Sequence, residues 1–418
     1  MRIAIFSDNF YPELSGISDS VIGLAKELTE RGHDIHFYAP RYSSADFAKS
    51  NLPAEEINLG ARVSVTRYAS FFFGSGSGQG RAVIPTGLRW IGATRRFHPD
   101  VIHTQTFFGT GIEALAASRA LGIPLVGTNH TAIKNFLIYN PIKTRWMDAA
   151  IVKYVNWYYE RCDTVTAPSR SVFAEMEESG FRKEGIALSN PIDTERFRPL
   201  SDDRPAIRER FGIGDHAIIH AGRLAKERSI DVMIRALPIV KKSVPDAQLV
   251  FSGRGADEPA FRRLAAELGV AESVVFLGFL PAEQLVEAYN AGRVFAITST
   301  SDTQSMVTMQ AMACGIPVVG VRARALPEYI TPETGFIVEP GDPAALAEKI
   351  VLLLENPALA EQLGEGGRRS ALQFSPPKIA DRWEAIYREA IERRSGREDG
   401  GESGGADKRK KEGIMKHT

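Results

Sequence analysis

Cysteine is scarce in this chain, whose 418 residues include only Cys162 and Cys314. Two cysteines so far apart offer neither a disulfide framework nor a metal cluster, and they are typical of a reducing compartment. No run of about 18 apolar residues occurs, so we expect nothing to span a membrane. The start MRIAIFSDNF lacks the charged region and long apolar run of a signal peptide. We therefore expect a cytoplasmic protein, with peripheral contact to the inner face of the cell membrane left open.

An excess of either charge is also absent, because 51 lysines and arginines balance 51 aspartates and glutamates. A balanced chain has no strong basic field, so nucleic acid is not an expected partner. The length fits two domains of about 150–200 residues each. A hydrophobic content of 44% is ordinary for a globular protein.

Apolar runs alternate with amphipathic segments from the first residues onward. Residues 2–7 are typical of a buried parallel strand, residues 8–18 of a loop, residues 21–31 of a helix and residues 34–39 of the next strand. This pattern is typical of a Rossmann-type unit, which binds nucleotides at the carboxyl ends of its strands. After a proline-flanked linker at residues 190–199, the alternation resumes. The strands expected there are residues 217–221, 247–252, 274–277, 294–297, 317–321 and 336–338.

The most informative stretch is SDTQSMVTMQAMACGIPVVG at residues 301–320. Asp302 opens a loop, Gln310 follows within the next segment, and PVV indicates a buried strand. A loop that feeds a helix N-terminus collects unpaired backbone N–H groups and the positive end of the helix dipole. That arrangement suits a diphosphate, and polar side chains at its rim can hold the hydroxyls of a sugar nucleotide.

This stretch resembles the nucleotide-sugar motif of family-four glycosyltransferases, which are retaining enzymes of the GT-B fold. The resemblance covers about residues 1–393, and the accompanying motifs occur in the family's order. These motifs are PELSGIS at residues 12–18, HTQTF at 103–107, TNHT at 128–131, AGRLAKERSID at 221–231, SGRG at 252–255 and FLGFL at 276–280.

The resemblance implies an α/β, GT-B architecture of two Rossmann-like domains whose parallel sheets face each other across a cleft. Residues 1–190 would form the acceptor-binding domain, with a last helix at 376–394 packing back on it. Residues 191–375 would form the nucleotide-sugar domain. Residues 395–418 are rich in Gly, Glu, Lys and Arg, which predicts a disordered charged tail.

The resemblance also assigns roles to individual residues. His130 would lie near the donor sugar and the acceptor hydroxyl, Asp302 would orient the sugar, and Arg223 and Arg228 would stabilise the departing diphosphate. The residues expected to bind the nucleotide sugar are Gly16, Gly253, Phe279, Ser305, Met306, Val307 and Gln310. Taken singly, these residues also fit ordinary turns, a capping histidine, a solvated basic turn and a helix-surface glutamine.

Three positions depart from the family's pattern. Relatives have glutamates where this chain has Asp302 and Gln310, and lysine where it has Arg228. A glutamine keeps one carbonyl acceptor and gains donors, so Gln310 is expected to hold ribose hydroxyls more weakly than a carboxylate. Either the site is adapted to a different donor or its catalysis is lost. No D-x-D motif ends a strand, so we expect no metal and no other cofactor.

The acceptor is suggested by residues 128–162, where aromatic and basic side chains alternate. Such a segment suits a membrane interface, and together with the DTQ of residues 302–304 it resembles bacterial enzymes that glucosylate diacylglycerol. The alternative is a helix whose aromatic residues pack in the core. The aromatic and basic residues of segment 128–162 are Lys134, Phe136, Tyr139, Lys143, Arg145, Trp146, Lys153, Tyr154, Trp157, Tyr158 and Tyr159.

Residues 71–79 (FFFGSGSGQ) indicate a mobile loop.

We therefore predict a hexosyltransferase that uses a nucleotide sugar such as UDP-glucose or GDP-mannose. The acceptor hydroxyl would belong to a membrane lipid such as diacylglycerol, or to a saccharide. Two other classes remain open at this stage: a non-catalytic nucleotide-sugar or lipid-binding protein, and a nucleotide-sugar epimerase of the same fold.

Overall fold

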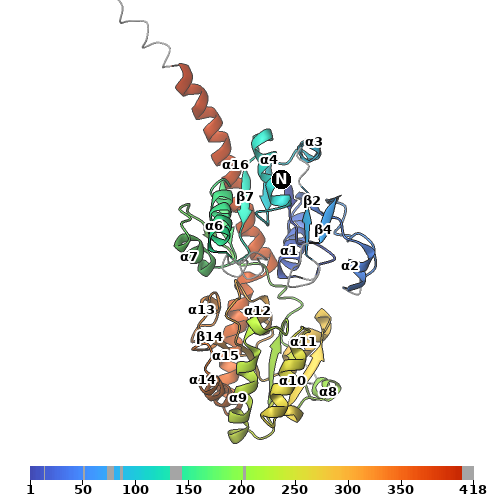
Figure 1. Cartoon of the computed structure of the whole chain (residues 1–418), viewed down its shortest axis with the longest axis vertical. Coiled ribbons are helices and arrows are strands. Elements are labelled where there is room, and N and C mark those ends of the chain that lie inside the picture. The colour runs from blue at the N-terminus through green and yellow to red at the C-terminus, as the bar shows by residue number, and fades with distance from the viewer. Residues whose placement is uncertain are drawn as a thin grey trace, which may run out of the picture. The chain divides into compact units, whose positions relative to one another are not determined.

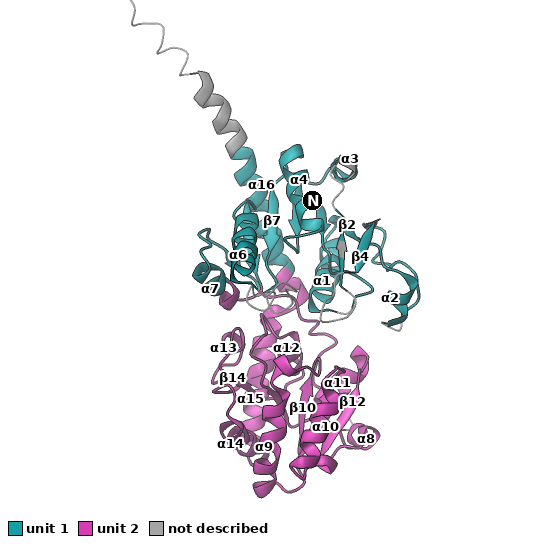
Figure 2. Ribbon diagram, viewed as in Figure 1, with its two compact units in different colours: residues 1–167, 173–188, 380–418 teal, residues 168–172, 189–379 magenta. Residues whose placement is uncertain are grey.

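A computed structural model of the chain describes residues 1–13, 15–49, 52–72, 80–84, 88–131, 144–200 and 204–406. The chain divides into two compact units (Figure 2). Unit 1 comprises Met1–Ala167, Phe173–Leu188 and the chain from Ala380 onward, and unit 2 comprises Pro168–Val172 and Ser189–Ile379. Each unit contains a parallel sheet with helices, so the predicted two-domain α/β class is confirmed.

Unit 1 is built on a seven-stranded sheet with the order β3-β2-β1-β6-β7-β8-β9, and its strands pair in parallel. A separate antiparallel pair is formed by β4 and β5. The strands are β1 (Arg2–Phe6), β2 (Asp34–Pro40), β3 (Val63–Tyr68), β4 (Ser70–Phe72), β5 (Arg81–Val83), β6 (Val101–Thr104), β7 (Leu125–Thr128), β8 (Thr164–Ala167) and β9 (Ile186–Ala187).

The helices of unit 1 include one that begins earlier than its apolar stripe predicts. Ser15 accepts a hydrogen bond from the Ser18 N–H as the N-cap, so α1 starts at Gly16 rather than at residue 21. Gly16, which the sequence placed in a loop, is therefore the first residue of a helix. The helices are α1 (Gly16–Glu30), α2 (Ser44–Lys49), α3 (Leu88–Phe97), α4 (Thr110–Leu121), α6 (Arg145–Tyr159) and α7 (Arg170–Glu178).

Unit 2 is built on a six-stranded parallel sheet with the order β12-β11-β10-β13-β14-β15. The strands lie within about two residues of their predicted positions, because buried parallel strands are continuous apolar runs. They are β10 (Ala217–Ala221), β11 (Gln248–Ser252), β12 (Val274–Gly278), β13 (Val294–Ile297), β14 (Val318–Val321) and β15 (Gly335–Val338).

The helices of unit 2 enclose its core, and α9 lies side by side with α14 (Figure 1). Although α9 contains Pro238, it continues to Ser243, because Leu237 and Val240 extend its buried stripe. The helices are α8 (Arg204–Phe211), α9 (Ile230–Ser243), α10 (Glu258–Glu267), α11 (Ala282–Ala291), α12 (Met306–Ala313), α13 (Leu326–Tyr329), α14 (Pro343–Glu355) and α15 (Pro357–Ala371). Three 3-10 turns are η1 (Lys226–Arg228), η2 (Ala271–Ser273) and η3 (Leu372–Phe374).

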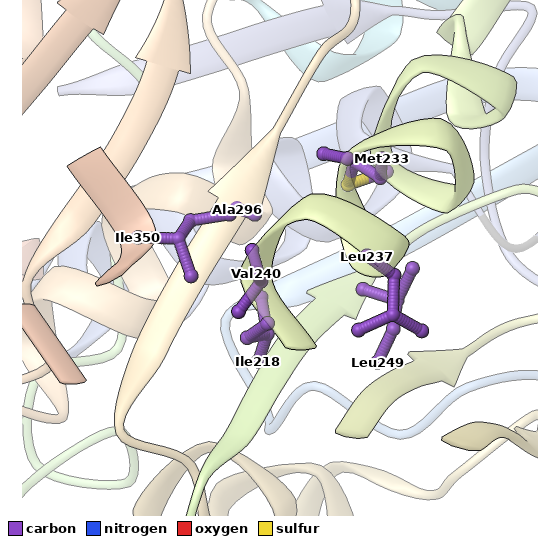
Figure 3. Close-up of a pocket in the computed structure, with 8 residues that line it drawn as sticks. Ile218, Met233, Leu237, Val240, Leu249, Ala296 and Ile350 are labelled. Atoms are coloured by element: carbon purple, nitrogen blue, oxygen red, sulfur yellow. The ribbon is translucent and has the colours of Figure 1, made fainter. Parts of the chain in front are cut away.

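A small cavity of about 10 Å³ lies inside the core of unit 2 (Figure 3). Figure 3 shows Met233, Leu237 and Val240 of α9 on one side of it. The lining is apolar and offers a water molecule no hydrogen-bonding partners, so this cavity is a packing defect rather than a ligand site. The remaining lining residues are Ile218, Ala236, Leu249, Ala296 and Ile350.

The last helix, α16 (Pro376–Ala406), belongs to unit 1 from Ala380 onward. Trp383 and Tyr387 are buried; the Trp383 ring stacks on Tyr387 at a centroid distance of 5.4 Å and lies tilted against the His103 ring at 4.5 Å. The helix extends past residue 395, where the sequence predicted a disordered tail, and residues 407–418 lie outside the described residues. None of the helices in the described part combines the length and apolar character needed to cross a bilayer.

Candidate active site

The strand order of the unit 2 sheet reverses between β10 and β13, so the loops after these two strands diverge from one point. In open α/β sheets ligands bind outside the carboxyl ends of the strands at such a point. The two loops are joined there, because the Thr298 hydroxyl donates hydrogen bonds to the carbonyl oxygens of Arg228 (3.2 Å) and Ser229 (2.8 Å). The sequence motifs around Arg228 and Asp302 therefore meet at the position where the fold favours a ligand.

Arg228 and Asp302 form an ion pair at this point, between Nη1 and Oδ1. The same Nη1 also donates to the Ser299 hydroxyl at 3.2 Å. The side chain of Asp302 is 10% exposed and that of Arg228 is 26% exposed, so the pair lies at the rim of the sheet rather than in open solvent. Asp302 Oδ2 is buried and has no hydrogen-bond partner among the described residues, and a buried carboxylate oxygen in this state favours a donor from a ligand.

Arg223, the other predicted cation, pairs with Glu227 at 2.8 Å within the turn after β10. Both side chains are partly exposed, and an ion pair of this kind stabilises a fold by only about 0–1 kcal/mol. Its guanidinium can therefore exchange Glu227 for a phosphate at little cost.

The residues predicted to hold phosphate through their backbone lie at the N-terminus of α12. Ser305 precedes the helix in the left-handed region, with φ 63°, and its hydroxyl lies 2.7 Å from the Thr308 hydroxyl. The partly buried side chains of Met306 and Val307 pack against the core of unit 2, so their polar contacts with a ligand would come from the main chain. The first N–H groups of a helix have no carbonyl partner within it, which leaves them available for an anion.

Gln310 lies one turn further along α12. Its carbonyl oxygen accepts a hydrogen bond of 3.3 Å from the hydroxyl of Tyr289, which is fully buried on α11. The side-chain oxygen of Gln310 is therefore already engaged by the Tyr289 hydroxyl and is less available to accept a hydrogen bond from a ligand. The amide NH2 group is the donor that Gln310 can offer to a ligand.

Gly253 lies in the loop after β11, where only glycine fits. Its φ is 140°, and an added Cβ would come within 1.8 Å of the Gly222 carbonyl oxygen. Its N–H donates to the Gly278 carbonyl oxygen at 2.7 Å, so the three loops after β10, β11 and β12 are held together by their main chains. Phe279, next to Gly278, is 54% exposed and presents its ring beside these loops.

The sequence analysis missed His220, which occupies the strand β10 just before Gly222 and Arg223. Its Nδ1 lies 2.9 Å from the Ala296 carbonyl oxygen, while its Nε2 is buried and without a hydrogen-bond partner in the described ranges. Burial lowers the pKa of His220 to about 4, and the nearby Arg228 charge adds to this effect. A histidine within an otherwise apolar strand was the available signal.

His130 lies in unit 1, directly after β7. Its Nε2 is 2.7 Å from the side-chain oxygen of Gln105, which follows β6. Burial lowers the pKa of His130 to about 4, so the imidazole is neutral near pH 7. His103 is fully buried behind these residues and contacts Thr128 and Tyr387 at 2.7 and 2.8 Å.

Asp8 occupies the corresponding reversal point of the unit 1 sheet, between β1 and β6. Its carboxylate accepts hydrogen bonds from the Thr110 N–H at the start of α4 (3.1 and 3.2 Å) and from the Thr106 hydroxyl (2.9 Å). A Cβ at Gly109 would lie 2.5 Å from this carboxylate. The helix N-terminus that could bind a phosphate in unit 1 is thus occupied by the chain's own carboxyl group, which favours unit 2 as the nucleotide site.

The aromatic segment divides into two classes of residue. Tyr158 and Tyr159 of α6 are buried in the core of unit 1, whereas Trp146 and Trp157 are 67% and 43% exposed. Arg161 lies over the Trp157 ring, 4.1 Å from its centroid. The core interpretation therefore holds for Tyr158 and Tyr159, whereas Trp146 and Trp157 face solvent and stay candidates for a membrane contact. Lys134, Phe136, Tyr139 and Lys143 lie outside the described residues, as do residues 73–79 of the loop predicted to be mobile.

Metal-binding side chains do not cluster in the part of the chain that the structure describes, where no three His, Cys, Asp or Glu residues are placed to hold an ion. The two cysteines are free and buried.

Solved structures with the same fold are glycosyltransferases of the GT-B class. The HepE protein of Anabaena in complex with UDP has a TM-score of 0.73 and 20% identity, with 93% of this chain and all of that chain (100%) covered. Sucrose-phosphate synthase from Thermosynechococcus elongatus has a TM-score of 0.71 and 21% identity, covering 93% of this chain and 98% of its own. At this level of identity the likeness establishes the fold.

Family models establish the class of enzyme. The model for glycosyl transferases group 1 matches residues 203–370, and that for glycosyltransferase family 4 matches residues 14–196. The chain belongs to the family-four glycosyltransferases and is an enzyme of that class. The binding-protein and epimerase alternatives are therefore set aside.

Two curated relatives show to which kinds of glycosyltransferase this chain is similar in sequence. The alpha-monoglucosyldiacylglycerol synthase of Acholeplasma laidlawii is 24% identical over 94% of this chain and 98% of its own length. A GDP-mannose-dependent phosphatidylinositol monomannoside mannosyltransferase of Mycolicibacterium smegmatis is 37% identical, over 43% of this chain and 50% of its own.

Proposed function

We propose that this glycosyltransferase moves a hexose from a uridine diphosphate sugar, such as UDP-glucose, to a hydroxyl of a membrane lipid, with retention and without a metal. Diacylglycerol is the lipid that the full-length relative supports, since its name gives a monoglucosyldiacylglycerol synthase. The solved HepE structures, which contain UDP and UDP-glucose, support the donor.

The single observation that carries the proposal is the Arg228–Asp302 pair beside the N-terminus of α12. It brings together a cation for the departing diphosphate and a carboxylate oxygen for a sugar hydroxyl. Backbone N–H groups of Ser305, Met306 and Val307 lie in the same loop, where a phosphate would accept their hydrogen bonds.

In the proposed reaction, Arg228 and Arg223 stabilise the negative charge that develops on the leaving diphosphate. Asp302 accepts a hydrogen bond from the hexose and fixes its orientation. The acceptor hydroxyl attacks the face of the sugar that the diphosphate leaves, and its proton passes to the departing phosphate oxygen. Because the guanidinium groups and the helix dipole supply the positive charge, the step needs no divalent ion.

Lipid as the acceptor is supported by the solvent-facing side of α6. Trp146, Lys153 and Trp157 recur at helical spacing on the exposed side of this helix, and the exposed Arg161 follows just after its end. Tryptophan and basic residues on one helix face are typical of segments that lie in a membrane interface.

The test of the donor measures UDP or GDP release from a panel of nucleotide sugars, with and without vesicles that contain diacylglycerol or phosphatidylinositol. We expect release from one UDP-hexose that depends on the lipid. Arg228→Ala should abolish it, whereas Arg235→Ala, which removes an exposed arginine of α9 in the same unit, should leave it unchanged. Lipid-independent release with a soluble saccharide acceptor would overturn the lipid assignment.

The test of the membrane face measures vesicle co-sedimentation of a Trp146→Ala/Trp157→Ala double variant. We expect at least about a tenfold loss of affinity for anionic vesicles, since each tryptophan buries a large apolar surface in the interface. Phe279→Ala is the matched control, because it removes an exposed aromatic ring from unit 2. Equal binding by wild type and the double variant would exclude this face as the contact.

A further inference from the structure

Gln304 lies in the loop between Asp302 and the start of α12, and its side chain is buried, with 3% of the residue exposed. Its amide pairs with both main-chain groups of Asn190. Oε1 accepts a hydrogen bond from the Asn190 N–H at 2.9 Å, and Nε2 donates to the Asn190 carbonyl oxygen at 3.1 Å. Nε2 also donates to the Ser189 hydroxyl at 2.8 Å. The amide therefore binds the main chain as a neighbouring strand would, which fixes its position.

The segment that Gln304 binds is itself anchored in unit 2. The long stretch of this unit begins at Ser189, so Asn190 lies where the chain enters the unit. Two residues further on, the Ile192 N–H donates to the Phe374 carbonyl oxygen at 2.8 Å, and the Ile192 side chain lies in the hydrophobic core. Gln304 therefore ties the loop before α12 to a fixed point 114 residues away in sequence.

Ser305, the next residue, has a strained backbone, with φ 63° and ψ 72°. A residue with a Cβ adopts this left-handed conformation at a cost in free energy, so its surroundings must hold it there. On one side, its hydroxyl lies 2.7 Å from the Thr308 hydroxyl, and its carbonyl oxygen accepts from the Thr308 N–H at 3.1 Å. On the other side, the support comes from Gln304.

The conformation of Ser305 sets the direction of the N–H groups that follow it, at Met306 and Val307, because it is the residue from which α12 starts. N–H groups at a helix N-terminus bind anions when they point at them. Asp302 indicates independently that a ligand binds here. Its side chain is 10% exposed, and its buried Oδ2 has no hydrogen-bond partner among the described residues.

We propose that Gln304 is a positioning residue for the diphosphate of the donor: by pairing with the main chain of Asn190, it holds Ser305 in the conformation that presents the first N–H groups of α12. The proposal rests on the proposed function, which places a nucleotide diphosphate at this loop. It adds the residue that fixes the loop. It also explains a buried amide at position 304, since an amide both accepts from an N–H and donates to a carbonyl, which a carboxylate does not.

The first test measures the dissociation constant of UDP for the full-length protein by isothermal titration calorimetry. Gln304→Met keeps the length and nearly the volume of the side chain but loses both hydrogen bonds to Asn190. We expect UDP to bind about tenfold or more weakly, because the loop no longer holds its N–H groups in place. Gln362→Met is the matched control, since it makes the same change at an exposed glutamine on α15 of the same unit.

A second substitution separates positioning from a general loss of stability. Glycine adopts the left-handed conformation without the cost that serine pays, so Ser305→Gly makes the support of Gln304 less necessary. We therefore expect Gln304→Met to weaken UDP binding much less in the Ser305→Gly background than in the wild-type background, which a double-mutant cycle measures. A loss of general stability would be the same in both backgrounds.

Hydrogen exchange without nucleotide gives a readout that does not depend on UDP. In Gln304→Met we expect residues 189–192 and 305–309 to exchange about tenfold or more faster, and the inner strand β10 of the same sheet to be unchanged. Gln304→Glu is the second variant, for use if Gln304→Met does not fold. It keeps the hydrogen bond from the Asn190 N–H and loses the one to the Asn190 carbonyl, so the same changes are expected in the same direction.

Two outcomes would overturn the proposal: equal UDP affinity of wild type and Gln304→Met, or an equal loss of affinity in the Ser305→Gly and wild-type backgrounds. Failure of the proposed function is distinguishable, because a wild-type protein that binds no UDP would refute the nucleotide site, whereas hydrogen exchange would still report whether Gln304 holds the loop. Circular dichroism of each variant checks that it is folded.

Discussion

At the scale of single residues, Arg228 and Asp302 form an ion pair. These are two of the positions where the sequence departs from the family pattern that it resembles, in which a lysine and a glutamate are expected. The aspartate is one methylene shorter, and the arginine presents a longer, forked cation that can span the difference. This pairing supports adaptation of the site rather than its decay.

The first prediction tests whether the two side chains compensate for each other in length. Asp302→Glu and Arg228→Lys should each lower kcat/KM by about tenfold or more, because each leaves a partner of the wrong length. The double variant should recover part of the loss, with a coupling energy of about 1 kcal/mol or more in a double-mutant cycle. Strictly additive losses would show that the two residues act independently.

The second prediction concerns Asp8, whose burial raises its pKa to about 7. In the folded protein this carboxyl is protonated below about pH 7, whereas in the unfolded chain it ionises near pH 4. Between these values the folded state binds the extra proton, so the Asp8 contribution to stability decreases as pH rises from about 4 to 7. Above pH 7 a buried charge remains.

Asp8→Asn removes that charge. The free energy of unfolding of Asp8→Asn minus that of wild type should therefore be about 2–3 kcal/mol larger at pH 8 than at pH 5. Urea unfolding of both proteins at both pH values measures this difference. Asp34→Asn is the control, since it removes a carboxylate that is a largely exposed partner of Arg62. A difference between Asp8→Asn and wild type that is constant with pH would contradict the assignment.

At the scale of elements, α6 and α9 show what sequence patterns leave to the tertiary structure. The pattern in α6 combined core and surface aromatic residues, and only the helix geometry separates buried Tyr158 and Tyr159 from exposed Trp146 and Trp157. In α9 the helix continues past Pro238, because burial of Leu237 and Val240 outweighs the lost backbone hydrogen bond.

The third prediction uses the cavity beside α9. Leu237→Ala should enlarge it and destabilise unit 2 by about 3–5 kcal/mol, because the surrounding core already leaves space unfilled. The same change at Leu359, which is only partly buried, should cost about 1–2 kcal/mol.

The chain's four tryptophans, Trp90, Trp146, Trp157 and Trp383, lie in unit 1. Far-UV circular dichroism follows both units, so it should detect the loss in unit 2 whether or not tryptophan fluorescence changes. Equal costs for the two leucines would contradict the cavity argument.

At the scale of the whole molecule, the two similar sheets differ in the residues that fill the point where their strand order reverses. The strand order reverses once in each. In unit 1 that point is filled by Asp8 on the N-terminus of α4, and in unit 2 it holds the Arg228–Asp302 pair next to α12. Of the two reversal points, both within the described residues, the one in unit 2 is therefore the site that we propose for the nucleotide.

The fourth prediction follows from this asymmetry. Addition of UDP should slow hydrogen exchange in the unit 2 loops at residues 222–229 and 299–309, and should leave the unit 1 loop at residues 105–111 unchanged. Asp302→Asn with UDP serves as a comparison, because it should weaken sugar contacts more than those of the diphosphate. Equal protection of the unit 1 loop would show that Asp8 does not exclude the nucleotide.

The sequence by itself determined the two parallel α/β units and most of the unit 2 strands, because continuous apolar runs and helical stripes are local properties of the chain. It also located the loops with Arg228, Asp302 and His130. It could not show that His220 Nε2 is buried without a described partner, nor the Gln105–His130 contact or the Asp8 carboxylate at α4, because these depend on residues far apart in sequence that strand order brings together. Tertiary structure alone decided which polar groups are buried and paired, and hence their charge.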